Sequence, residues 1–170
     1  MPKSRPLRAV GAEYLDVAPV HETLRQVIPA GAAATFRCLE DPDAWPVWLD
    51  PIDSVVWTSP KPFGVGATRD VAGKVGTISE LFFDWDDGHR MSFHFTSATV
   101  PVFGAFCEDY ELVPHGDDEC ELVWRYGFEC RSVFKLVQPI VAIGFKRACK
   151  KSLVQLAEFM RQHRDEYAAA

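Results

Sequence analysis

The sequence predicts an α+β domain in which an antiparallel sheet packs against one long C-terminal helix. Three features favour this class. A helical run covers residues 135–167, a series of strand-like runs covers residues 52–128, and only two short helical runs separate the first strand from the others. Because two short helices cannot cover a sheet, we expect them to close one end of it while the long helix covers a face.

Residues 1–16 mix proline, arginine, glycine and acidic residues without a period, and they predict a flexible N-terminal arm. One domain then spans residues 17–167. Its first strand is expected at 17–28, and the two short helices at 32–39 and 42–49. Six further strands, separated by turns rich in Gly, Pro and Asp, are expected at 52–59, 67–72, 75–85, 89–98, 105–113 and 120–128.

The composition suits a globular domain, because 48% of the 170 residues are hydrophobic. No apolar run reaches the roughly 18 to 20 residues that cross a bilayer, and no signal core follows the basic N-terminus. The net charge of −6 disfavours nucleic acid as a partner. Five cysteines without a Cys-x-x-Cys pair predict free thiols, so we expect a cytoplasmic location.

At about 100° per residue, the C-terminal helix divides into two faces. One face is apolar and consists of Val141, Phe145, Ala148, Cys149, Ser152, Leu153, Leu156, Phe159 and Met160. The opposite face is basic and carries Lys146, Arg147, Lys150 and Lys151. This basic face either docks on an anionic membrane or a partner, or is a solvated surface attracted to the acidic remainder of the chain.

The last two strands have the clearest register. Their inward residues are predicted to form a strongly apolar face that meets the helix, made of Phe106, Glu108, Tyr110 and Leu112 opposite Leu122, Trp124, Tyr126 and Phe128. Glu108 is the exception on this face. A buried carboxylate costs several kcal/mol unless it is paired. Glu108 therefore either bonds Tyr126 or a buried cation, turns outward at a bulge, or anchors a ligand.

For the strands at 75–85 and 89–98, the sequence does not decide which face points inward. One face is apolar and carries Leu81, Phe83, Trp85, Met91, Phe93 and Phe95, which burial alone would turn inward. The other face holds Glu80 and His94, which can form a polar cluster with Arg69. Both faces are too apolar for a sheet with one side in water, so we expect something to cover part of the outer side, such as a dimer partner.

The chain resembles the START-like or SRPBCC superfamily, in its polyketide cyclase/dehydrase and lipid-transport branch. The similarity covers about residues 18–162 and lies in the segments 36–48 (FRCLEDPDAWPVW), 64–69 (GVGATR), 79–81 (SEL), 85–90 (WDDGHR), 112–114 (LVP) and 145–147 (FKR). This resemblance implies a helix-grip fold, a curved seven-stranded antiparallel sheet wrapped around the long C-terminal helix, with a hydrophobic cavity between them. It also implies that Glu80 points into that cavity.

Three functions are compatible with these features. The first is binding of a hydrophobic small molecule, lipid or polyketide-like, in the internal cavity. The second is a polyketide aromatase/cyclase or dehydratase with Glu80, His94 and Arg69 as catalytic candidates. The third is docking of a partner or membrane through the basic helix face. The residues expected to contact a ligand are Arg69, Glu80, Phe82, His94, Phe106, Glu108, Tyr110, Trp124, Tyr126, Gly144, Phe145, Ala148 and Ser152.

No cofactor or metal is expected. The sequence has no phosphate-binding glycine loop and no zinc motif, and its five histidines lack metal-ligand spacing. Gly64 and Gly66 lie in a loop that lacks the third glycine and the following helix of a dinucleotide site.

Overall fold

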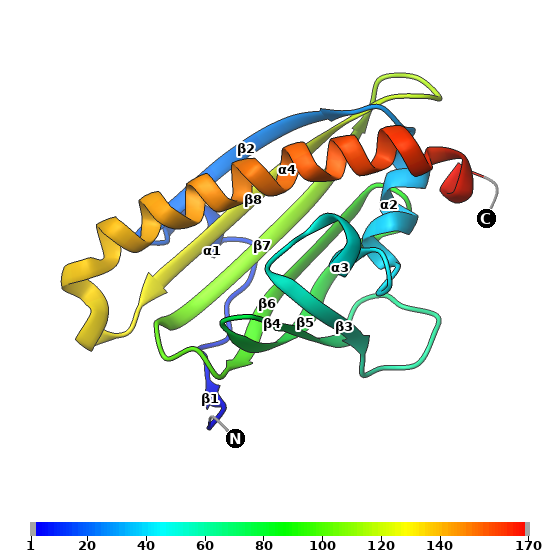
Figure 1. Ribbon diagram of the computed structural model, residues 1–170. Coiled ribbons are helices and arrows are strands. Elements are labelled where there is room, and N and C mark those ends of the chain that lie inside the picture. The colour runs from blue at the N-terminus through cyan, green and yellow to red at the C-terminus, as the bar shows by residue number, and fades with distance from the viewer. Residues whose placement is uncertain (1–2, 169–170) are drawn as a thin grey trace.

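The computed structural model of the chain describes residues 3–168 and shows a curved antiparallel sheet with one long helix along its concave face (Figure 1). The strands are β1 (Arg5–Pro6), β2 (Val20–Ile28), β3 (Ile52–Trp57), β4 (Thr68–Gly73), β5 (Gly76–Asp86), β6 (Arg90–Ala98), β7 (Phe103–Pro114) and β8 (Cys120–Cys130). The helices are α1 (Tyr14–Val17), α2 (Ala32–Glu40), α3 (Trp45–Trp48), the 3-10 helix η1 (Ser132–Val137) and α4 (Gln138–Ala168).

The main path of the sheet has seven strands in the order β2-β8-β7-β6-β5-β4-β3, and the two-residue β1 pairs with β6. All described pairings are antiparallel. The predicted helix-grip fold is confirmed. β2 begins later than the strand expected from residue 17, because α1 and a bend occupy the residues before Val20.

The long helix is anchored mainly through its C-terminal part. Its fully buried residues all lie between Cys149 and Met160. Near its end, Arg37 on α2 donates to the carbonyl of Tyr167, and the hydroxyl of Tyr167 donates to Asp41. Before Cys149 the helix is only partly buried or exposed. The first three turns of α4 therefore contact the main core only through partly buried residues, among them Val141, Ala142 and Phe145.

The middle strands differ from both arrangements that the sequence left open, because β5 and β6 contain two irregularities in their pairing. Register shifts occur between Ser79 and Glu80 and between Phe82 and Asp84. A bulge changes which side chains share a face. As a result, Glu80 and Phe82 of β5 pair with the apolar residues of β6, and the inward face combines residues from both predicted faces.

Residues 3–17 lie along the convex face of the sheet. The amide of Leu7 donates to Thr96, and that of Arg8 donates to Gly104. A second apolar cluster forms beneath this segment, made of Val10, Tyr14, Leu15, Ala18, Ala105 and Cys107, with Phe83 packed against it. The N-terminal arm thus supplies cover for the outer apolar residues, for which the sequence had suggested a dimer partner.

Candidate functional site

The candidate site is a group of four polar or amphipathic side chains in the aromatic interior. It consists of Glu108, Tyr110, Trp124 and Tyr126, here called the polar cluster. Their cross-strand pairs, Glu108 with Tyr126 and Tyr110 with Trp124, match the register predicted from the sequence. β2 continues the rows, since Glu22 pairs with Tyr126 and Leu24 with Trp124. The polar cluster therefore lies next to the edge strand that borders α4.

Glu108 is buried, and this burial favours its uncharged carboxyl form. The hydroxyl of Tyr110 donates to its Oε2 at 2.7 Å, so the partner is Tyr110 and not Tyr126. Burial raises the pKa of Glu108 to about 8, although the hydrogen bond from Tyr110 acts in the opposite direction. Burial also raises the pKa of Tyr110. At neutral pH the carboxyl group is mostly protonated and can donate or accept a hydrogen bond.

Two other members of the polar cluster have unused hydrogen-bonding groups. The hydroxyl of Tyr126 and Nε1 of Trp124 are buried without a hydrogen-bond partner among the described residues. The Trp124 indole still lies near enough to Glu108 to lower that pKa slightly. An unsatisfied buried donor costs about 1–3 kcal/mol, and such groups are rare in folded proteins. Four groups outside the cluster share this state: the Tyr14 hydroxyl, Trp48 Nε1, His94 Nδ1 and Arg131 Nε.

Arg69 and Glu80 form a buried ion pair further along the concave face. Nε of Arg69 donates to Oε2 of Glu80 at 2.5 Å, and Nη1 of Arg69 donates to the carbonyl of Leu39 at 3.5 Å. Burial raises the pKa of Glu80, while the neighbouring Arg69 opposes this rise. The guanidinium also lies within 5.4 Å of the ring centres of Trp45, Trp57, Phe82 and Phe93. Glu80 thus lies in the buried interior with its carboxylate held by Arg69, and its contact with a ligand stays a prediction.

His94 is not part of this arrangement, so the predicted Glu80–His94–Arg69 cluster is wrong. The shifts in the β5–β6 register place His94 opposite Leu81, on the convex side. There its ring stacks on Phe83, which packs against the cluster beneath the N-terminal arm. Burial lowers the pKa of His94. With His94 on the other face of the sheet, the acid-base pair of Glu80 and His94 cannot operate as one site.

The helix contributes Phe145 and Ser152 to the interior. Phe145 makes edge-to-face contacts with Tyr126, Phe106 and Phe128 at ring-centre distances of 4.9, 5.3 and 5.7 Å. Ser152 is buried and donates to the carbonyl of Ala148 within the helix. Phe145 thus packs against Tyr126 of the polar cluster and against the phenylalanines beside it.

Gly144 and Ala148 are exposed, and their predicted place on the cavity wall is wrong. A Cβ atom added at Gly144 would meet no atom within 4 Å. This part of α4 faces the core with Val141, Ala142 and Phe145, so Gly144 and Ala148 lie outside the contact.

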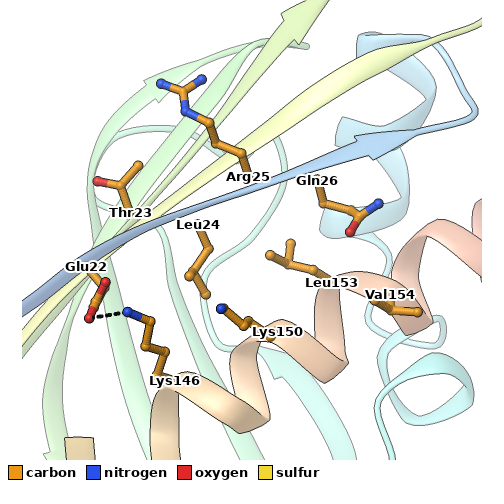
Figure 2. Close-up of a pocket in the computed structure, with 9 residues that line it drawn as sticks. All are labelled: Glu22, Thr23, Leu24, Arg25, Gln26, Lys146, Lys150, Leu153 and Val154. Atoms are coloured by element: carbon orange, nitrogen blue, oxygen red, sulfur yellow. Dashed lines mark hydrogen bonds and ion pairs between the residues drawn. The ribbon is translucent and has the colours of Figure 1, made fainter. Parts of the chain in front are cut away.

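A groove open to solvent lies between β2 and α4 (Figure 2). It has a volume of about 480 Å³ and is lined by Glu22, Thr23, Leu24, Arg25, Gln26, Lys146, Lys150, Leu153 and Val154. Lys146 Nζ and Glu22 Oε1 lie 2.6 Å apart across it. Both side chains are partly exposed, so the pair contributes about 1 kcal/mol at most. The groove is an open rim and not the enclosed cavity that the resemblance implied.

Three further predictions concern the cysteines, metal ligands and membrane-spanning helices. All five cysteines are buried and unpaired, in agreement with the prediction of free thiols. Within residues 3–168, no three His, Cys, Asp or Glu side chains gather as metal ligands would. No helix in the same range is long and apolar enough to cross a membrane.

The comparisons with known proteins agree with this architecture. Residues 19–161 match the family model described as polyketide cyclase / dehydrase and lipid transport. An uncharacterized protein of Mycobacterium tuberculosis is 32% identical over 149 residues, which cover 84% of this chain and 87% of the relative. The chain has a helix-grip fold and belongs to the polyketide cyclase/dehydrase and lipid-transport family.

Two solved structures with little sequence identity share the fold. The Zhui aromatase/cyclase from Streptomyces sp. R1128 superposes with a TM-score of 0.71 at 14% identity, covering 84% of this chain and 94% of that one. A START superfamily protein from Mycobacterium smegmatis superposes with a TM-score of 0.66 at 14% identity, covering 86% and 98%. At this level of identity the likeness shows the fold alone.

Proposed function

We propose that the protein binds a hydrophobic small molecule between the sheet and α4, with a polar end of the ligand at the polar cluster. The observation that carries this proposal is the pair of unsatisfied donors, Tyr126 Oη and Trp124 Nε1, beside the protonated Glu108. Aromatic rings surround them, which suits a flat or chain-like apolar ligand. The family of the chain, whose description includes lipid transport, supports the same class of ligand.

The polar end of the ligand is expected to be uncharged. A carbonyl oxygen can accept hydrogen bonds from Tyr126, Trp124 and protonated Glu108. A carboxylate ligand would bring a second negative charge next to Glu108 in a medium of low dielectric constant, which is costly. Ketones, esters and polyketide-like carbonyl groups therefore fit this site better than free fatty acids.

Binding requires Phe145 to move. Its ring packs on Tyr126, but it lies in the part of α4 that is only partly buried. The Lys146–Glu22 pair beside it is weak, because both groups are partly exposed. A small outward displacement of the first turns of α4 would open the groove in Figure 2 to the polar cluster.

Acid catalysis is a second candidate, and Glu108 is the residue that favours it. A carboxyl group that stays protonated near neutral pH in a dry site can deliver a proton to a ligand carbonyl, as an aromatase/cyclase or dehydratase requires. Glu80 suits this role less well, because its carboxylate is held by Arg69. If this activity exists, Glu108→Gln should abolish turnover of a poly-β-ketone substrate while binding is retained.

Fluorescence titration tests the binding proposal. The probes are 1,8-dihydroxyanthraquinone and 1-oleoylglycerol, which are apolar and carry carbonyl groups. Tyr126→Phe should weaken binding of at least one probe about fivefold, the value of one neutral hydrogen bond. Tyr14→Phe is the matched control, because it removes an equally unsatisfied hydroxyl from the convex face. Equal losses in both variants, or no binding of either probe, would contradict the proposal.

A further inference from the structure

One end of the molecule exposes a set of large apolar side chains. They lie on η1 and the first turns of α4, and we call them the apolar tip: Val133, Leu136, Val137, Ile140 and Ile143. Leu136 is 96% exposed, Val133 82%, Ile140 71% and Ile143 55%. Single exposed apolar residues are common on proteins, but five within eleven positions form a patch of the kind that marks a docking surface.

Cations follow the apolar tip along the same side of α4. Ile140, Ile143, Arg147 and Lys150 are spaced by three or four residues, which keeps them on one side of a helix. At a rise of 1.5 Å per residue, Arg147 lies about 10 Å along the axis from Ile140. The exposed side of the helix is therefore apolar at its start and basic beyond it, which is the arrangement of a segment that enters a lipid interface.

The charge of this region is unlike that of the rest of the chain. Residues 130–157 contain six Lys and Arg residues and no Asp or Glu, whereas the remaining residues contain twelve Lys and Arg against 24 Asp and Glu. Of these six cations, Lys146 pairs with Glu22 and Lys151 lies 3.5 Å from Asp50. Arg147 and Lys150 are exposed and have no acidic partner among the described residues.

We propose that this end of the molecule docks on membranes that contain anionic phospholipid, with the apolar tip inserted and Arg147 and Lys150 at the headgroups. Apolar burial and attraction to anionic headgroups then act together. A second copy of the chain is a poorer occupant, because a symmetric contact would place two basic regions against each other. None of these side chains belongs to the polar cluster, although Lys150 also lines the groove between β2 and α4.

Vesicle sedimentation tests the proposal with the full chain. We expect binding to vesicles of phosphatidylcholine and phosphatidylglycerol (7:3), much weaker binding to pure phosphatidylcholine, and loss of binding in 0.5 M NaCl. Leu136→Asp/Ile140→Asp should weaken binding by more than about tenfold. Its matched control is Val65→Asp/Val75→Asp, which adds the same charge, because Val65 is 70% and Val75 80% exposed and both lie outside the patch.

A second pair of variants isolates the charge. Arg147→Gln/Lys150→Gln should weaken binding about tenfold or more, since each cation near an anionic surface contributes about fivefold. Lys74→Gln/Arg164→Gln removes the same charge from exposed positions elsewhere and should bind like the wild type. All of these positions are exposed, so circular dichroism should show unchanged folding.

Three results would overturn the proposal. They are absence of binding to the mixed vesicles, equal loss in the patch and control variants, and a concentration-dependent dimer in analytical ultracentrifugation that Leu136→Asp/Ile140→Asp abolishes. The last result would assign the apolar tip to a contact between two copies of the chain. Failure of the vesicle assay leaves the titration with Tyr126→Phe unaffected, so the two proposals are tested separately.

Discussion

Replacing Glu108 by glutamine should make the protein more stable at alkaline pH. Glutamine keeps the shape of the side chain and an oxygen that accepts the hydrogen bond from Tyr110, but it cannot ionise. In the folded wild type, burial raises the pKa of Glu108 from the ordinary 4.5 to about 8. The folded state therefore holds one more proton than the unfolded state between these two pH values.

The sign of the effect follows from this extra proton. Wild-type stability is fully present below about pH 4.5 and falls as the pH rises toward 8, because the unfolded state ionises Glu108 freely in water while the folded state keeps it protonated. The pKa difference of about three and a half units, at about 1.4 kcal/mol per unit, sets an upper limit of about 5 kcal/mol on the loss in the free energy of unfolding. Since a buried group gains some solvation when it ionises, we expect about 2–3 kcal/mol.

Urea denaturation at pH 5 and pH 8.5 measures this difference. The free energy of unfolding of Glu108→Gln should match the wild type at pH 5 and exceed it by about 2–3 kcal/mol at pH 8.5. Glu111→Gln is the control, because Glu111 lies on the same strand but is exposed, and its effect should be close to zero at both values. If Glu108→Gln shows the same difference at both pH values, Glu108 is not a buried protonated acid and the account of the polar cluster is wrong.

Three further changes test the interior by denaturation and binding. Arg69→Met should destabilise the fold by about 3–5 kcal/mol, because it leaves Glu80 buried without a partner. Arg69→Met/Glu80→Met should recover most of this loss. A double variant no more stable than the single one would contradict the pairing. Phe145→Ala should cost about 2–3 kcal/mol and tighten probe binding by freeing space, whereas no change in affinity would place the ligand elsewhere. Lys146→Ala should lower the free energy of unfolding by less than about 1 kcal/mol. It should also speed probe association in stopped-flow measurements. An unchanged association rate would argue against entry through the groove.

The sequence predicts the fold well because its signals are local. The last hairpin has uninterrupted alternation on both strands, so the two-residue alternation alone predicts the pairing of Glu108 with Tyr126. The long helix has a continuous apolar arc over its second half, and the buried residues from Cys149 to Met160 follow it.

The errors in the predicted site arise where tertiary packing departs from the regular spacing of residues along a strand or helix. A register shift has no strong sequence signal, yet the two in β5 and β6 separate His94 from Glu80. The exposure of Gly144 and Ala148 depends on which side of α4 faces the core, and a helical wheel does not fix that side to within one residue position. The unused groups of Trp124 and Tyr126 became visible only in three dimensions, because sequence gives residue types and not hydrogen-bond partners.

The binding of a hydrophobic ligand is the central claim, and native mass spectrometry of the purified protein followed by organic extraction tests it most directly. We predict an adduct of discrete mass that extracts into organic solvent, carries a neutral carbonyl group, and is depleted in Tyr126→Phe relative to Tyr14→Phe. A bare protein mass, together with no change in thermal stability across neutral lipids and aromatic polyketides, would contradict the claim.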